Sequence, residues 1–187
     1  MVHYRLADLF PHLGLDGPDL LLRQFGQQAF PILEEWLHSI APGTALVLDS
    51  ADVRVMDSSF ADEAIIELAL GLVGGRFDDR FLILADPTEA TCDNIEGTIA
   101  RRKAKLALLV RSRDRTSILG HLEANLTEAW RLTYGAGEIT ARDLANKLGL
   151  EINTASTRLL KLHQARLLAR TEVMTSTGRQ HIYRLPA

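Results

Sequence analysis

The residues best suited to binding chemistry lie in one polar stretch near the end of the chain, residues 153–164. In a helix, side chains three and four positions apart share a face. One predicted face holds the apolar residues Ala155, Leu159 and Leu162. The other side of the helix holds amides, hydroxyls and cations, namely Asn153, Thr154, Thr157, Arg158, Lys161 and Gln164. Amides can bind the edge of adenine, Arg and Lys can bind guanine, and hydroxyls and cations can hold phosphates, so this side suits duplex DNA.

Residues 153–164 contain no Asp or Glu. This absence helps to distinguish a helix that binds DNA from one that faces water or another protein. On a helix that faces only water or another protein, acids are expected about as often as lysines. A helix that lies against phosphates excludes acids, because like charges repel. The composition therefore favours DNA over a protein partner.

Three helices are predicted to position this surface. An amphipathic helix is expected over residues 117–133, and a second helix over residues 141–148, which Gly149 ends. The polar helix follows near residues 153–165. Two helices joined by a tight turn form a helix-turn-helix unit.

A β-hairpin is predicted to follow the polar helix. Its strands are expected at residues 168–174 and 180–185, and its tip at residues 175–179. The whole order, over residues ~117–187, resembles the winged helix-turn-helix domain of bacterial repressors. The resemblance implies that the polar helix enters the major groove and that Arg179 reaches the DNA backbone or the minor groove.

One position departs from this resemblance. Winged helices usually have glycine just before the leucine that starts the first hairpin strand, because the helix end there needs a positive φ. Here Arg166 precedes Leu167. Either the turn differs, or Arg166 adopts the left-handed conformation at a cost of about 1 kcal/mol.

Charge divides the chain into two parts. Residues 115–187 contain 10 Lys and Arg against 6 Asp and Glu, whereas residues 1–114 contain 11 against 18, and the formal net charge is −3. A basic second part can approach phosphates that would repel an acidic first part. We therefore expect two domains, residues 1–114 and residues 115–187, with residues 111–116 as the linker.

The first part alternates apolar runs with helical patterns. Three short apolar runs are typical of buried parallel strands: residues 45–48, 81–84 and 106–110. Helices are expected before and between them, over residues 24–39, 61–73 and 88–101. This alternation predicts an α/β domain, whereas residues 1–23 match no clear pattern.

The segment after the first of these strands resembles the STAS fold of sulfate transporters and anti-sigma-factor antagonists. Leu46-Val47-Leu48-Asp49 leads into Asp57-Ser58-Ser59-Phe60-Ala61-Asp62-Glu63, and the likeness is strongest to a STAS-like domain of unknown function over residues ~20–111. In the antagonists a partner kinase phosphorylates the first serine after the Asp, which implies Ser58 here. A phosphate there would add roughly two negative charges at a helix N-terminus. Phe60-Ala61 replaces the Gly-Leu of the antagonists.

Ser58 also has a plainer interpretation. Serine in a strand-to-helix turn commonly caps the helix, so Ser58 or Ser59 can act as the N-cap. Asp57, Asp62 and Glu63 are expected to serve the cap, the helix dipole and the solvated face rather than catalysis.

No pattern indicates an enzyme, a metal site or a cofactor. Cys92 is the only cysteine, the six histidines stand singly, and Gly74-Gly75 is not a phosphate-binding loop. The densest basic stretch, residues 101–105 with three more arginines by residue 115, has two interpretations of equal weight. It can be a second phosphate-binding track or a solvated helix end.

These observations predict a cytoplasmic, bacterial, DNA-binding transcription regulator. The winged helix is expected to bind double-stranded DNA, and the STAS-like domain to sense a signal, dimerise or bind a partner. A homodimer is favoured because winged helices commonly bind palindromes. The start of the chain has no signal-peptide pattern, and there is no apolar run of about 18 residues, so no membrane contact is expected. The alternative is an adaptor in a partner switch, in which a kinase-like ATPase phosphorylates Ser58 and the winged helix binds protein.

Overall fold

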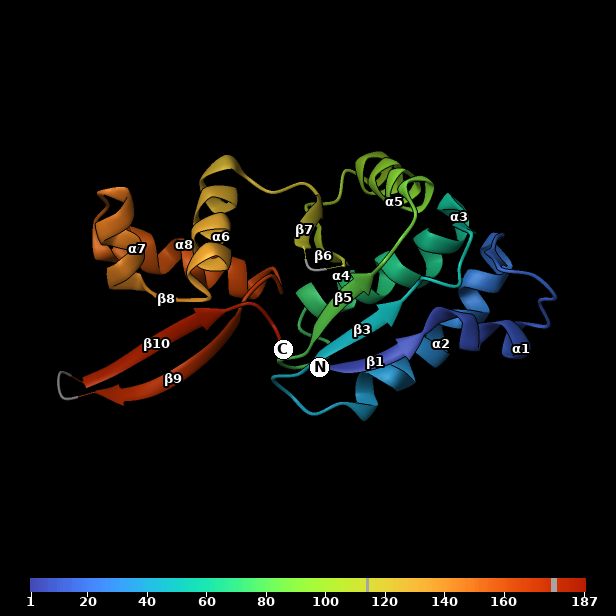
Figure 1. Cartoon of the computed structure of the whole chain (residues 1–187), viewed down its shortest axis with the longest axis horizontal. Helices are drawn as coiled ribbons and strands as arrows, with labels where there is room; N and C mark the ends of the chain where they lie inside the picture. The colour runs from blue at the N-terminus through green and yellow to red at the C-terminus, as the bar shows by residue number, and fades with distance from the viewer. Residues whose placement is uncertain (114, 176–177) are drawn as a thin grey trace. The chain divides into compact units, whose positions relative to one another are not determined.

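The computed structural model describes residues 1–113, 115–175 and 178–187. The chain forms two compact units, Met1–His121 and Leu122–Ala187 (Figure 1). Each unit has its own sheet and its own buried apolar residues. The division falls after His121, whereas the charge pattern leads us to expect it after residue 114.

The first unit is built on a five-stranded, mainly parallel sheet. Its strands are β1 (Val2–Arg5), β3 (Ala45–Asp49), β5 (Phe81–Ala85), β6 (Ala107–Ser112) and β7 (Arg115–Gly120), in the order β1-β3-β5-β6-β7. The first four run parallel, and β7 runs antiparallel to β6. The three strands expected from apolar runs are confirmed as β3, β5 and β6. The sequence does not predict β1, because an edge strand with mostly exposed side chains has no apolar run.

Residues 111–112 and 115–116 lie in strands, so the expected linker is wrong, and the helix expected over residues 117–133 is confirmed only from Ala124 onward. β7 pairs with β6 along its whole length, and the helix, α6 (Ala124–Ala136), begins only after it. Gly120 has a φ of +94°, which an α-helix does not contain. The apolar spacing that suggests a single helix runs from Leu119 in the strand into α6, so its helical period is accidental.

Helices pack on this sheet to form one apolar core. They are a 3₁₀ turn at Leu6–Asp8, α1 (Leu9–Leu13), α2 (Arg23–Ser39), α3 (Ser58–Ala61), a π-helical turn at Asp62–Ile66, α4 (Glu67–Val73) and α5 (Glu89–Arg102). A short parallel pair, β2 (Asp19–Leu20) with β4 (Val55–Met56), joins the loops beside them. The expected helices over residues 24–39 and 88–101 are confirmed. The helix expected over residues 61–73 begins earlier, at Ser58, and contains the π-helical turn.

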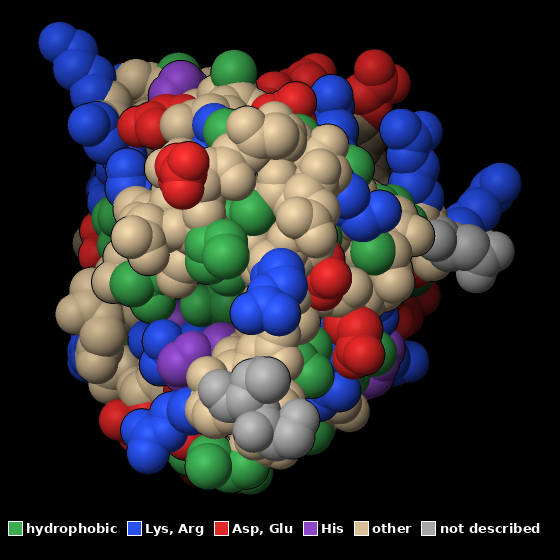
Figure 2. All heavy atoms as spheres, turned by 90° about the vertical axis from the view of Figure 1, so that its left-hand side faces the viewer, with side chains coloured by type: hydrophobic (Ala, Val, Ile, Leu, Met, Phe, Trp, Pro, Cys, Tyr) green, Lys and Arg blue, Asp and Glu red, His purple; other side chains and the backbone are tan. Residues whose placement is uncertain are grey.

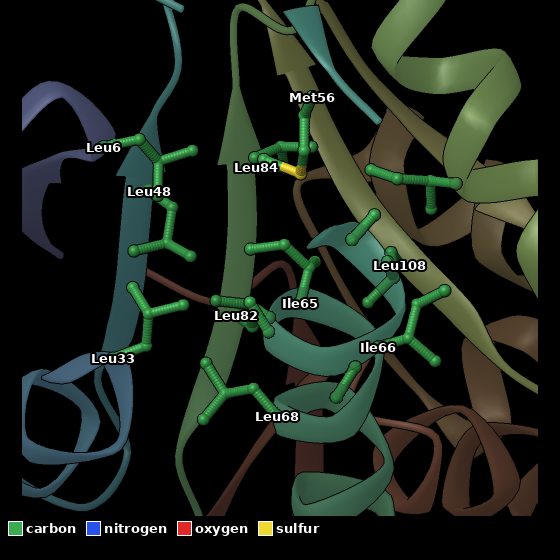
Figure 3. Close-up of a cluster of buried hydrophobic side chains, with 14 of the residues drawn as sticks. Leu6, Leu33, Leu48, Met56, Ile65, Ile66, Leu68, Leu82, Leu84 and Leu108 are labelled. Atoms are coloured by element: carbon green, nitrogen blue, oxygen red, sulfur yellow. The ribbon is translucent and has the colours of Figure 1, made fainter. Parts of the chain in front are cut away.

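The core lies between the sheet and these helices. Figure 3 shows side chains of β3, β5 and β6 pointing toward those of the π-helical turn and α4; the labelled residues include Leu48, Leu84, Leu108, Ile65, Ile66 and Leu68. All of them are buried. Burial of each such side chain contributes about 1.5–3 kcal/mol to the stability of the fold. The loops of this unit are therefore attached to a stable, well-packed interior.

The second unit joins three helices to a three-stranded antiparallel sheet. In chain order it contains α6, β8 (Glu138–Thr140), α7 (Ala141–Leu148), α8 (Ile152–Gln164), β9 (Ala169–Thr175) and β10 (Gly178–Arg184), and the sheet order is β8-β10-β9. The helices expected near residues 141–148 and 153–165 are confirmed, as is a hairpin after them. Residues 176 and 177, within the expected tip, lie outside the described residues.

Local sequence explains where the helices of this unit begin and end. The Asp143 backbone N–H donates to Thr140 Oγ1, and the Thr140 N–H donates to the Asp143 carboxylate at 3.0 Å, which is a capping box at the start of α7. These bonds from Thr140 hold the pKa of Asp143 below its usual range. Gly149 ends α7 with a φ of +63°. After α8, Arg166 has a φ of +61°, so the left-handed arginine is confirmed as the alternative that the chain adopts.

Candidate nucleic-acid interface

Helix α8 is held by its apolar side. Ala155, Leu159 and Leu162 are fully buried, as the predicted wheel requires. The helix packs against both α6 and α7. Its other side is therefore turned away from the core of this unit.

The outward side of α8 carries polar residues that the sequence singles out. Five of the six are exposed: Asn153, Thr154, Thr157, Lys161 and Gln164. The helix contains no Asp or Glu, and Lys161 has no ion-pair partner among the residues that the structure describes. The Thr157 hydroxyl donates to the Asn153 carbonyl at 2.8 Å, which leaves its oxygen free to accept. This surface offers amides, hydroxyls and an unneutralised positive charge.

Arg158 is the sixth of these residues, and it points elsewhere. Its Nη1 lies 3.4 Å from Glu128 Oε2 and 3.5 Å from the Asn125 carbonyl, both on α6. Only 18% of its side chain is exposed. Arg158 therefore links α8 to α6. The helical wheel places it beside the outward side but cannot show that α6 covers that flank.

The hairpin brings three charged or titratable side chains together. Arg179 on β10 is 68% exposed, and its Nε lies 3.1 Å from Glu172 Oε1 on β9. The other carboxylate oxygen of Glu172 lies 3.5 Å from His181 Nε2. One acid is thus shared between two basic side chains.

A hollow of about 280 Å³ lies between the starts of α7 and α8 and the hairpin. Arg142 from α7, Ser156 from α8, and Arg179 and His181 from β10 contribute to its lining. Figure 2 faces the end of the molecule that carries the hairpin, and shows blue and purple side chains gathered beside it. The hollow is polar, lined by cationic groups, and large enough for a phosphate group.

The sequence does not predict the contribution of Arg142 and Ser156. Arg142 stands in the first turn of α7, where the helix dipole disfavours a cation. The carboxylate of the neighbouring Asp143 already interacts with this cation, so the position by itself does not indicate a bound anion. The place of Arg142 beside the hairpin depends on how the two elements pack.

The candidate residues are spread along the whole length of α8 and do not form one compact cluster. Ile152 lines the hollow at the start of α8, and Gln164 ends the helix about 18 Å away at the usual rise per residue. The structure brings Arg179 close to the start of α8, and leaves Lys161 and Gln164 toward its other end.

In the first unit, the structure confirms Asp57 as a cap residue, whereas the expectation that Ser58 or Ser59 is the N-cap is wrong. Asp57, rather than Ser58 or Ser59, caps α3: its carboxylate accepts from the Phe60 N–H at 2.7 Å, from the Leu22 N–H at 3.0 Å and from the Ser59 hydroxyl at 2.9 Å. Burial would raise the pKa of Asp57, but these donors outweigh it and hold the pKa below its usual range. Ser58 is half-buried, with its Oγ 3.3 Å from Asn94 Oδ1.

Asp62 and Glu63 belong to an ionic network. Arg23 pairs with both, and Arg102 pairs with Asp62 and with Glu67, the last at 2.6 Å. Asp62 is buried and only 19% of the Glu63 side chain is exposed, so the solvated face expected among these acids is wrong. Arg102, from the basic stretch at residues 101–105, is occupied by these carboxylates and cannot serve a phosphate-binding track.

The described residues indicate neither a metal site nor a membrane-spanning helix, and comparisons with known proteins identify no relative. Within the described ranges, no three His, Cys, Asp or Glu side chains are grouped as metal ligands would be. None of the described helices combines the length and apolar character of a membrane span. Comparisons of the chain with protein-family models, curated proteins and solved structures find no match. The geometry described above is therefore the basis for assigning a function.

Proposed function

We propose that the second unit is a winged helix-turn-helix domain that binds duplex DNA, in a chain that regulates transcription. The observation that carries this proposal is the outward side of α8, which is polar and basic and has no acid along the helix. A helix with side chains is about 10–12 Å wide, and the major groove of B-DNA is about 12 Å wide.

In this proposal the residues of α8 have different tasks. Asn153 and Gln164 carry amides that can form paired hydrogen bonds with adenine. Lys161 and the hydroxyls of Thr154 and Thr157 can bind phosphates, which set the register of the helix on the duplex. Arg158 acts on α8 from behind by fixing it to α6.

The hairpin and the hollow extend the contact beyond the groove. A backbone phosphate next to the start of α8 would meet Arg142, Ser156 and Arg179, the groups that line the hollow. Arg179 could leave Glu172 for the phosphate or keep both, because its planar guanidinium carries five donors.

We also propose that the first unit is a STAS-like domain that senses, dimerises or binds a partner. Its α/β fold with a mainly parallel sheet supports this assignment only at the level of fold class. Two copies of the chain would present two α8 helices to a palindromic site.

The experiment that tests DNA binding uses the full chain and a labelled pool of random-sequence duplexes. Fluorescence anisotropy would be measured at about 50 mM salt and at rising salt. We expect binding that weakens with salt. Lys161→Ala should lower affinity about three- to tenfold and reduce the salt slope by about one. Thr157→Ala and Arg179→Ala should also weaken binding.

The matched control is Arg131→Ala. Arg131 is an exposed cation of the same unit, on α6 rather than α8. Its loss should leave affinity within about twofold of the parent if the surface of α8 is responsible. Absence of duplex binding at low salt, or equal losses from Lys161→Ala and Arg131→Ala, would refute the proposal.

The second candidate function is a phosphorylation-controlled partner switch at Ser58. One observation favours it: Ser58 is the first residue of α3 and is partly exposed, so a kinase could reach it. The neighbouring Asp57 carboxylate opposes it, because a phosphate would stand beside an ionised acid. Ser58→Asp should abolish capture of an ATPase-type kinase and leave DNA binding unchanged if the switch operates. Retained capture would exclude it.

A further inference from the structure

The first unit contains a second hollow, with a volume of about 470 Å³. It lies between the last turns of α5, the connection that follows, and the end of β7. Its inner surface is formed by Ile99, Ala100, Ala104 and Gly120. Ile99 is only 3% exposed, so the floor of the hollow is continuous with the apolar core.

Backbone geometry and small side chains create this space. Lys103 ends α5 in the left-handed conformation, and the Ala104 N–H donates back to the Ile99 carbonyl at 3.2 Å. Gly120 faces this turn; a Cβ there would lie 3.0 Å from Ile99 Cδ1 and 2.6 Å from the Leu106 carbonyl oxygen. The glycine is therefore required by the close approach of β7 to Leu106 and Ile99.

The rim of the hollow carries positive charge. Lys103 and Lys105 are exposed, and neither has an ion-pair partner among the residues that the structure describes. His121 stands on the β7 side, and Glu96 is the single acid of the lining. Lysine stems are apolar and their ammonium groups are charged, so such a rim can cover a hydrocarbon and bind an anionic head together.

We propose that this hollow binds a small amphipathic acid, an aliphatic or aryl carboxylate whose apolar body rests on Ile99 and Ala104. Its carboxylate would be held by Lys103 and Lys105. Small-molecule sites are commonly apolar hollows of roughly 300–1,000 Å³ with a few polar groups that fix orientation, and this hollow matches that description.

The position of the hollow suggests what such a ligand does. Gly120 and His121 are the last two residues of the first unit, and α6 of the second unit begins at Ala124. A ligand in the hollow would contact the segment of chain that leads into the second unit. Coupling to DNA rests on the function proposed above, whereas ligand binding does not and is measured without DNA.

The test uses the full chain and decanoate as the probe. Binding would be followed by calorimetry and by the amide resonances of Gly120 and His121, which should shift on titration. Lys103→Asn with Lys105→Ala should weaken binding about tenfold or more, because charge-assisted bonds to the carboxylate are lost. Asparagine suits the left-handed position of residue 103. Ala100→Trp fills the hollow from an exposed helix position and should abolish binding.

Controls separate this site from general affinity for detergents and lipids. Lys147→Ala removes an exposed lysine of the second unit and should leave decanoate binding unchanged. Decanol should bind at least tenfold more weakly than decanoate. Equal binding of decanol, shifts confined to amides outside residues 96–121, or preference for anionic phosphatidylglycerol vesicles over free decanoate would each overturn the proposal.

Discussion

Asp57 joins two segments of the first unit, residues 20–22 and the start of α3. Its two oxygens accept from the backbone of Leu22 and of Phe60, and its own N–H donates to the Leu20 carbonyl at 3.0 Å. Leu22 has a φ of +71°, an unfavourable conformation for leucine. The hydrogen bond that the Leu22 N–H donates to Asp57 offsets the energy cost of that conformation. It also fixes the start of α2 beside the start of α3.

This arrangement predicts the effect of Asp57→Asn. An amide has one oxygen, so it can cap α3 but cannot also accept from Leu22. We expect a loss of about 1–2 kcal/mol in the free energy of unfolding at pH 7, measured by urea denaturation. The exposed Asp16→Asn should have little effect. A variant as stable as the parent would show that the bond to Leu22 contributes nothing.

Asp57 also predicts how stability depends on pH. Its pKa is lower in the folded protein than in the unfolded chain, where Asp titrates near 3.9. The ionised carboxylate therefore stabilises the fold above about pH 4, and this contribution is lost as pH falls through the folded pKa. As pH falls below about 4, the parent should lose stability more steeply than Asp57→Asn. Parallel curves would contradict this assignment.

Glu172 is the residue that most limits positive charge on the hairpin. It pairs with Arg179 and lies near His181, both of which line the hollow beside α8. If that hollow receives a phosphate, Glu172→Gln should raise duplex affinity about two- to fivefold at low salt. Glu138→Gln changes the net charge equally at an exposed position outside the lining, and serves as control. An equal gain in both variants would mean that only net charge matters.

At the scale of elements, the backbone of the connection between α8 and the hairpin is strained at one residue. Arg166 has a φ of +61°, where glycine is commonly found after a helix. Arg166→Gly should therefore stabilise the second unit by about 0.5–1 kcal/mol, observed as a higher unfolding temperature. A lower temperature would show that contacts of the arginine side chain outweigh the strain.

Few residues determine where α7 begins, where it ends and how the chain turns into α8. The capping box of Thr140 and Asp143 starts α7, and Gly149 ends it. Only Gly149, Leu150 and Glu151 separate the helices, so this short turn restricts the direction of α8, and packing against α6 and α7 fixes it. Arg158 contributes to that packing through Glu128.

At the scale of the whole molecule, the two units have separate cores, and each contains one of the two tryptophans. Trp36 stacks on Tyr4 with ring centroids 4.7 Å apart in the first unit, and Trp130 is 5% exposed in the second. Trp130→Phe therefore leaves a reporter for the first unit, and Trp36→Phe leaves one for the second.

Urea unfolding of these two variants should give transitions with different midpoints. The first unit should also unfold with the larger m-value, since that slope increases with the surface exposed on unfolding. Coincident midpoints and equal slopes would show that the chain unfolds as one cooperative body. If the units unfold separately, far-ultraviolet circular dichroism, which follows both units, should span the two fluorescence transitions.

Several features of this protein follow from local sequence. The apolar runs of β3, β5 and β6, the buried side of α8 and the glycine that ends α7 are all evident from residue types and spacing. Each depends on neighbours within about one turn or one strand, whose preferences the sequence states directly. For the same reason the acid-free side of α8 can be recognised without a structure.

Only the tertiary structure decides which distant groups meet. β7 is a strand because β6 lies beside it, although Leu119 continues the helical spacing of α6. Asp57 accepts from Leu22, Arg158 turns to Glu128, and Arg142 reaches the hairpin hollow, each because of a partner remote in sequence. Side-chain direction is settled by packing between elements, and that packing has no periodic trace along the chain.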